Sequence, residues 1–217
     1  MLYVKKFTFN PFSENTYVVT DELNNSVIID PGCYYKAEQN EIDNYILKNN
    51  LKLKSILHTH SHLDHMFGTA YLAEKYNLDL WICKEDLVTY ESYEKVCEVY
   101  GIPITFSPNP TPKFFDLKQL IHIEGIKFKI LFVPGHSPGH VAFYNQENNF
   151  LINGDCLFEN SIGRTDLPGG NHQQLINSIK NEIFQLPDET LVYCGHGNET
   201  TIKVEKSSNP FLSYYIS

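Results

Sequence analysis

The sequence predicts a layered α/β fold, in which two sheets carry helices packed on their outer sides. Blocks rich in β-branched and aromatic residues, typical of strands, are followed by segments with helical spacing of apolar residues, and this order occurs in both halves. With 217 residues, 42% of them hydrophobic, the chain can bury a full-sized core. We therefore expect a single domain spanning residues 1–217.

The first half begins with a predicted meander of three strands, at residues 2–9, 15–20 and 26–30, with a turn at 21–25. A helix is expected over 37–50, where Ile42, Tyr45 and Ile46 recur at helical spacing. The next strand, 53–59, leads directly into the histidine-rich stretch HTHSHLDH at 58–65.

Four further segments complete the first half. We expect a helix over 68–76, a short buried strand over 80–83, a helix over 84–101 and a proline-rich loop over 107–115. Gly101 and Pro103 stop the second of these helices.

In the second half we expect strands at 126–134, 140–145 and 149–155, one long helix at 172–186, and a final strand at 190–196. Residues 101–118 are the one candidate linker. We interpret this segment as a loop because the strands on either side serve one core.

Composition narrows the range of partners and compartments. The chain has 26 acidic and 17 basic residues, a net charge of −9 and no lysine or arginine run, which argues against a nucleic-acid partner. No stretch resembles a signal peptide or reaches the length needed to span a bilayer, so we expect a soluble cytoplasmic protein with no membrane partner. Five scattered cysteines without a CxxC pair are typical of reduced, buried thiols.

The stretch HTHSHLDH is a candidate metal site. Side chains alternate along an extended strand, so His60 and His62 point the same way and could bind one ion, while Asp64 and His65 follow the end of the strand. One tetrahedral zinc needs only three or four protein ligands. Two histidines, an aspartate and a third histidine within six residues therefore suggest a second ion nearby.

Three later segments share one pattern, an apolar strand that ends in a small residue and then a potential ligand. These segments are VPGH, INGD and VYCGH, which end in His136, Asp155 and His196. A single histidine or aspartate at a strand end is more often a turn or cap residue. Strand ends that meet at one edge would bring the three together with the first cluster, and the glycines would allow close approach of the backbone.

Five ordered segments, IIDPG, THSHLDH, PGHSPGH, NGDCLF and CGHG, resemble the motifs of the metallo-β-lactamase superfamily along nearly the whole chain. Within it, GRTDLPGG and the terminal NPFL are similar to the short bacterial relatives of glyoxalase II, the hydroxyacylglutathione hydrolases, which lack the C-terminal helical domain of the two-domain enzymes. The resemblance implies a four-layer αββα sandwich.

The resemblance also assigns each candidate ligand to one of two metal ions. His60, His62 and His136 would hold one metal ion, and a second set would hold the other: Asp64, His65 and His196. Asp155 would bridge the two ions and Asp30 would be structural. His58 and His140 fall outside the ligand pattern and are expected to pack or to support ligands, while His122 and His172 receive no role.

The chemistry implied is hydrolysis by two divalent ions, most simply zinc, with iron or manganese as alternatives. Two ions that share a carboxylate lower the pKa of a bridging water toward neutrality. The resemblance supplies the substrate, a small-molecule thioester such as S-lactoylglutathione, which the metal-bridging hydroxide, held with Asp64, would cleave to a 2-hydroxy acid and a free thiol.

Two questions stay open at the level of sequence. Arg164, the one arginine of the chain, could bind a substrate carboxylate or pair internally with Asp166.

The persulfide dioxygenases share HxHxDH and GRTD but use one iron, so a mononuclear iron dioxygenase is the alternative function. A non-enzymatic metal-dependent interaction protein is a third possibility, which the seven candidate ligands disfavour.

Overall fold

The computed structural model describes residues 1–105 and 108–213, and it divides the chain into two compact units. One unit holds residues 1–115 and 121–127, and the other holds 116–120 and 128–217. The division leaves the expectation of a single domain as a prediction. Residues 106 and 107 of the candidate linker lie outside the described residues.

The first unit contains a six-stranded sheet in the order β1-β2-β3-β4-β5-β6. Its strands are β1 (Tyr3–Phe9), β2 (Glu14–Thr20), β3 (Asn25–Ile29), β4 (Lys52–Leu57), β5 (Asp79–Ile82) and β6 (Lys113–Phe114). The first three strands form the expected antiparallel meander, and β3 to β6 are parallel to one another. The short strand β7 (Ile121–Ile123) belongs to the same unit.

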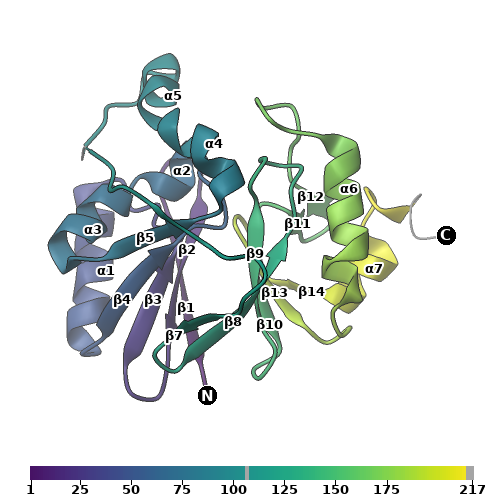
Figure 1. Ribbon diagram of the computed structural model, residues 1–217, viewed down its shortest axis with the longest axis horizontal. Coiled ribbons are helices and arrows are strands. Elements are labelled where there is room, and N and C mark those ends of the chain that lie inside the picture. Colours follow the sequence, from purple (N-terminus) through teal and green to yellow (C-terminus); the bar gives the residue numbers. More distant parts are fainter. Residues whose placement is uncertain (106–107, 214–217) are drawn as a thin grey trace. The chain divides into compact units, whose positions relative to one another are not determined.

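Helices of the first unit make the crossovers that parallel strands require. They are α1 (Lys36–Lys48), α2 (Leu63–Met66), α3 (Thr69–Tyr76), η1 (Lys84–Asp86), α4 (Leu87–Glu91) and α5 (Tyr93–Tyr100). Helices α1 and α3 lie along this sheet (Figure 1), and their apolar residues, such as Ile42 and Leu72, join a core with Val18, Ile28 and Ile56 of the strands. The expected helix over 84–101 is wrong as one element, because the chain breaks at Ser92, whose hydroxyl donates to the carbonyl of Thr89.

The second unit contains five strands of another sheet, in the order β14-β13-β10-β9-β8. They are β8 (Ile126–Phe132), β9 (Val141–Asn145), β10 (Phe150–Gly154), β13 (Leu191–Cys194) and β14 (Thr200–Thr201). Strands β10 and β13 are parallel, whereas the other pairs of neighbours are antiparallel. A separate hairpin joins β11 (Leu157–Phe158) to β12 (Ser161–Ile162).

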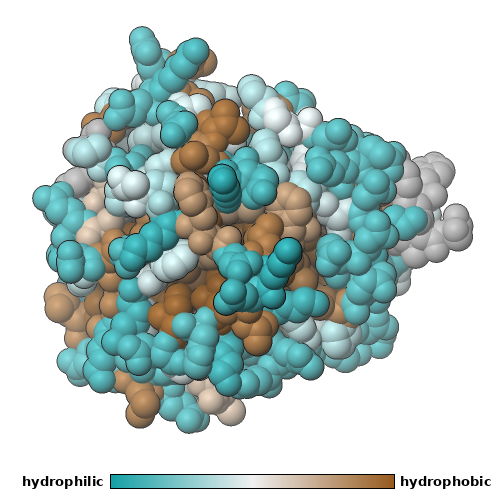
Figure 2. All heavy atoms as spheres, viewed as in Figure 1, coloured by the Kyte–Doolittle hydropathy of each residue, from teal (hydrophilic) through white to brown (hydrophobic). Residues whose placement is uncertain are grey.

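Two helices and a 3₁₀ turn pack on the second sheet: α6 (His172–Asn181), η2 (Ile183–Gln185) and α7 (Ile202–Ser208). The buried side of α6 joins a core with Leu151 and Val192, while Figure 2 shows a hydrophilic surface where α6 faces solvent. The expected helix over 172–186 is too long: α6 ends at Asn181, and Leu186 is extended because Pro187 follows it. No helix in the described ranges combines the length and apolar character needed to cross a membrane.

Candidate metal centre

The histidine-rich stretch lies where β4 ends, as expected, but the strand stops earlier than the sequence predicts. Strand β4 ends at Leu57, so His60 and His62 belong to a turn and the alternation of a strand does not orient them. Their rings nevertheless lie 4.8 Å apart, and the ring of His65 lies 4.2 Å from that of His60. Asp64 and His65 occupy the short helix α2. The turn therefore gathers four of the predicted ligands within the first unit.

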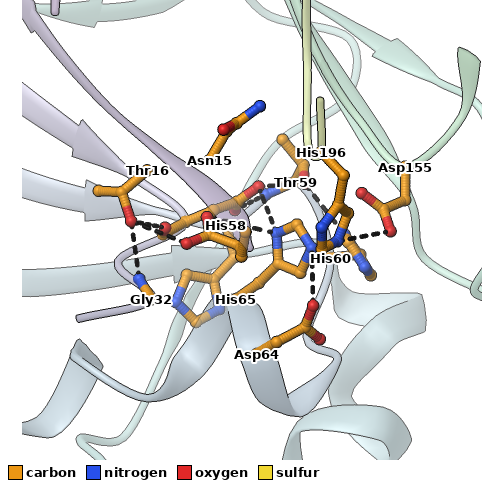
Figure 3. A network of polar contacts seen from close by, with 12 residues as sticks. Asn15, Thr16, Gly32, His58, Thr59, His60, Asp64, His65, Asp155 and His196 are labelled. Atoms are coloured by element: carbon orange, nitrogen blue, oxygen red, sulfur yellow. Dashed lines mark hydrogen bonds and ion pairs between the residues drawn. The ribbon is translucent and has the colours of Figure 1, made fainter. Parts of the chain in front are cut away.

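Asp30 supports this turn, in agreement with the structural role implied for it. Parallel pairing places the end of β3 beside the end of β4, and the Asp30 N–H donates to the Leu57 carbonyl. One Asp30 oxygen accepts from the Thr59 N–H at 2.7 Å. The other accepts from the Thr59 hydroxyl at 2.5 Å and lies 3.1 Å from His65 Nδ1. Figure 3 shows Thr59, His60 and His65 around this network.

These contacts set the tautomers of two histidines. A carboxylate can only accept, so His65 Nδ1 carries the hydrogen and Nε2 keeps its lone pair. The Thr59 hydroxyl gives its one hydrogen to Asp30 and so accepts from His60 Nδ1, 3.0 Å away. Both histidines therefore present Nε2 as the ligand atom, which is the arrangement that outer partners commonly impose on metal-binding histidines.

Glu14 is a buried acid beneath the same turn, and sequence reasoning did not identify it. The side chain is fully buried on β2, with Oε2 2.9 Å from the Thr16 hydroxyl and Oε1 3.8 Å from His65 Nδ1. Burial raises the pKa of the Glu14 carboxyl well above its usual range, and the neighbouring Asp30 raises it further, against the opposing effect of His65. Glutamate at the start of a strand gives no sequence signal for such burial.

Two more polar side chains hold the backbone of the turn. Asn10 donates from Nδ2 to the carbonyls of Gly32 and Asp64, each at 3.0 Å. Asp86, fully buried after β5, accepts from the Ser61 N–H at 2.6 Å. Sequence reasoning missed both residues, although Asp86 carries a usable signal because it follows a buried strand that is parallel to β4.

The second unit brings the other three predicted ligands to one edge of its sheet. Asp155 directly follows β10, and His196 follows β13, whose parallel pairing with β10 includes a bond from the Gly195 N–H to the Gly154 carbonyl. His136 follows β8, which runs in the same direction as β10 because both are antiparallel to β9. The Nε2 atoms of His136 and His196 lie 3.5 Å and 3.4 Å from Asp155 Oδ2.

Hydrogen bonds orient this group as well. His136 Nδ1 lies 2.8 Å from the carbonyl oxygen of Arg164, which can only accept, so Nδ1 carries a hydrogen and Nε2 faces Asp155. The Asp155 N–H donates to His140 Nε2 at 3.0 Å. His140 thus supports the backbone of a predicted ligand, as the sequence suggests.

The remaining predicted residues have plain structural surroundings. His58 is fully buried, bonds to the Thr69 hydroxyl at 2.9 Å, and has a pKa lowered by burial to about 4. Arg164 makes two hydrogen bonds of 2.7 Å to Asp166, so its guanidinium holds an internal partner in this structure. The five cysteines are free and buried, as predicted.

The predicted ligands therefore form two groups, one in each unit. The first contains His60, His62, Asp64 and His65, and the second contains His136, Asp155 and His196. The joining of these groups around two ions, with ligands taken from both, stays a prediction.

Comparisons with known proteins agree with the fold predicted from the sequence. Residues 9–196 match the metallo-beta-lactamase superfamily. The chain is 36% identical over 203 residues to the hydroxyacylglutathione hydrolase GloC of Haemophilus influenzae, covering 93% of this chain and 94% of that one.

Two solved structures are similar over nearly their whole length. One is TTHA1623 in a di-iron-bound form, with a TM-score of 0.85, 36% identity, and coverage of 96% of this chain and 100% of that one. The other is the BLEG-1 B3 metallo-beta-lactamase, also with a TM-score of 0.85, at 33% identity and with coverage of 97% and 100%. The α/β fold class of the metallo-β-lactamase type is confirmed.

Proposed function

Since the chain belongs to the metallo-beta-lactamase superfamily, whose members are metal-dependent hydrolases, we propose that it is a binuclear hydrolase of small-molecule thioesters such as S-lactoylglutathione. The products are a 2-hydroxy acid and a free thiol. The likeness to a hydroxyacylglutathione hydrolase along 93% of the chain supports this substrate class.

The observation that carries the binuclear proposal is the convergence on Asp155. Two imidazole Nε2 atoms, from His136 and His196, approach one oxygen of this carboxylate at 3.5 Å and 3.4 Å. A carboxylate that bridges two metal ions lies beside the other ligands of both ions. In the proposed ligand sets, His136 serves one ion and His196 the other, so the arrangement of the second unit fits a bridge.

The donor set fits the metals as well. In His60, His65 and His136 the Nδ1 hydrogen is held by an oxygen, so Nε2 is the atom that each ring would offer to a metal ion. Imidazole and carboxylate ligands suit zinc, iron and manganese. We propose zinc first, and the di-iron form of TTHA1623 makes iron the leading alternative. Bound ions would polarise the thioester carbonyl and lower the pKa of a water molecule.

Protein groups then have defined tasks. We assign Asp64 a catalytic place beside the reacting water, since the Asn10 amide fixes its backbone carbonyl and its Oδ2 lies 3.7 Å from His65 Nε2. Arg164 is proposed to bind a substrate carboxylate by exchanging its exposed partner Asp166, because solvent screening makes an exposed ion pair weak.

The proposed partner is a small molecule, with neither nucleic acid nor membrane as a target. The acidic charge of −9 supports the first exclusion. The five free cysteines support the cytoplasm, where thiols are kept reduced, as the proposed location.

Elemental analysis of the purified protein, followed by an S-lactoylglutathione hydrolysis assay on the same sample, tests this proposal. We expect two metal ions per chain and release of free thiol. One iron per chain with oxygen consumption on glutathione persulfide would instead establish the dioxygenase alternative.

Two further outcomes would overturn the thioesterase proposal. Hydrolysis of a β-lactam without thioester cleavage would favour the activity named for BLEG-1. A metal-loaded protein inactive on thioesters, lactones and β-lactams would favour a non-enzymatic role.

A further inference from the structure

We infer that Glu205 and Asn209, near the C-terminal end of the described chain, are positioning residues for His136. They act through the β11–β12 hairpin and the backbone carbonyl of Arg164. The inference rests on the proposed function only in taking His136 as a metal ligand. Every contact that carries it lies within the second unit.

Glu205 is a fully buried carboxylate on α7 that gathers three donors. Its Oε1 accepts from the Thr200 hydroxyl at 2.5 Å, while its Oε2 accepts from the Asn160 N–H at 3.0 Å and from Asn209 Nδ2 at 2.7 Å. Burying a charge is costly unless it is hydrogen-bonded, and of these three bonds the one from the Asn160 N–H ties the tip of the β11–β12 hairpin to α7.

Asn209 completes the attachment from the other side of the same turn. Its Nδ2 also donates to the Ser161 carbonyl at 3.0 Å, while its Oδ1 accepts from the Phe211 N–H at 3.0 Å. Asn160, between the two strands, has a left-handed backbone with φ of 54°. Glu205 and Asn209 thus hold the N–H of Asn160 and the carbonyl of Ser161, two neighbouring residues of this tight turn.

The clamped turn lies only a few residues from the atom that orients His136. After Ser161 come Ile162 and Gly163, and the next residue is Arg164. Gly163 packs against the Asp155 carbonyl so closely that a Cβ there would lie 1.9 Å from that oxygen. The following carbonyl, of Arg164, accepts from His136 Nδ1 at 2.8 Å. The position of the hairpin therefore sets the position of the group that fixes the tautomer of His136.

Leu212, in the same C-terminal segment, has a purely structural role. Leu212 is fully buried in the core of the second unit, where it anchors the C-terminal segment by packing. Comparing Leu212 with Asn209 therefore separates anchoring of the segment from positioning of His136. Asn209 is polar, and its side chain bonds to the hairpin turn, to Glu205 on α7 and to the Phe211 N–H of its own segment.

The test uses the full-length, metal-free protein labelled with 15N-histidine. Long-range 1H–15N spectra distinguish an imidazole with hydrogen on Nδ1 from one with hydrogen on Nε2. We expect His136 of the wild type to carry it on Nδ1. Asn209→Ala and Glu205→Gln should give a mixture of tautomers, and should weaken zinc binding by less than the roughly 10–100-fold that loss of a direct outer partner of a ligand costs, because the Arg164 carbonyl is displaced and not removed.

Three matched variants serve as controls. Asn177→Ala removes an exposed amide on α6, and Glu189→Gln removes an exposed carboxylate that pairs with Lys203. Both should leave the tautomer and the zinc affinity unchanged. Leu212→Ala should lower the melting temperature while its folded fraction keeps hydrogen on Nδ1.

Wild-type spectra and zinc affinity in folded Asn209→Ala and Glu205→Gln would overturn the inference, even if both melt at lower temperature. The same holds if Leu212→Ala disturbs the tautomer as much as they do. Should Asn209→Ala fail to fold, Glu205→Gln decides alone, because it keeps the size of the buried side chain. A wild-type protein that lacks thioesterase activity but shows the expected spectra would reject only the proposed function.

Discussion

Replacing Gly32 by alanine should disturb the histidine turn from below. Gly32 lies just after the end of β3, in the segment that carries Asp30. A Cβ at this position would lie 1.9 Å from Glu14 Oε2, 2.7 Å from Asn10 Nδ2 and 2.7 Å from the Asp64 carbonyl oxygen. The Glu14 side chain is buried and the Asp64 oxygen is backbone, so neither can yield by a simple rotation into solvent.

The expected cost follows from these contacts. Inserting a methyl group into a packed site costs about 1–3 kcal/mol. Displacing Asn10 or Glu14 would also break one hydrogen bond, worth about 1 kcal/mol. The free energy of unfolding should therefore fall by about 2–4 kcal/mol, which for a chain of this length lowers the melting temperature by about 5–15 °C.

Thermal unfolding of the metal-free protein, followed by circular dichroism, measures this effect. Gly101→Ala is the control, because a Cβ there has no atom within 4 Å and meets only the strain of a φ of 65°; we expect a cost of about 1 kcal/mol. In a double-mutant cycle, Glu14→Ala should recover part of the loss by removing the closest atom. A Gly32→Ala protein that melts like the wild type, or a cycle with no coupling, would refute the reasoning.

Three other predictions concern the ligands, the loop and a surface cluster. Asp155→Ala should reduce bound metal from two ions per chain to one or none and abolish thioester hydrolysis; full metal content by elemental analysis would remove the bridging role. Asp166→Asn should lower KM for substrates with a carboxylate about two- to fivefold, because the loss of this weak exposed ion pair frees Arg164; an unchanged KM for both acidic and neutral thioesters in steady-state assays would count against substrate binding by this arginine. Asp43 receives hydrogen bonds from Lys75, Tyr71 and Tyr76, which outweigh the opposing effect of burial and lower its pKa. Because the folded-state pKa lies below the unfolded value, the stabilisation is complete above about pH 4 and is lost as the pH falls through the folded pKa. Asp43→Asn should therefore be less stable than the wild type at pH 7 by about 1–3 kcal/mol in urea titrations, with a smaller gap below pH 4; a gap that does not change with pH would contradict the assignment.

The sequence predicts most of what depends on local pattern. The ends of β8, β10 and β13 were identifiable because apolar runs stop at a small residue followed by His136, Asp155 or His196, and the sheet of the second unit brings these three residues together. Asp30, which was expected to be structural, bonds to Thr59 and lies beside His65. Each of these signals lies within a few residues of the feature that it predicts.

The polar supports could not be found in this way, because their partners are distant in sequence. Asn10 bonds to a carbonyl 54 positions later, and Asn160 bonds to Glu205 across 45 positions. Glu14 has the composition of an exposed strand end, yet it is fully buried. Hydrophobic periodicity also carries no record of a break such as the one at Ser92, whose hydroxyl and backbone N–H both bond to the Thr89 carbonyl.

The parallel pairing of β10 and β13 separates distance in space from distance in sequence. Asp155 and His196 are held together by the ladder that ends at Gly154 and Cys194, whereas the chain between β10 and β13 passes through the β11–β12 hairpin, the Arg164 loop, α6 and η2. Insertions or deletions in the exposed turn at 187–189 would leave the ladder intact. The positions of Asp155 and His196 are therefore set by the sheet, whatever the length of the connection between β10 and β13.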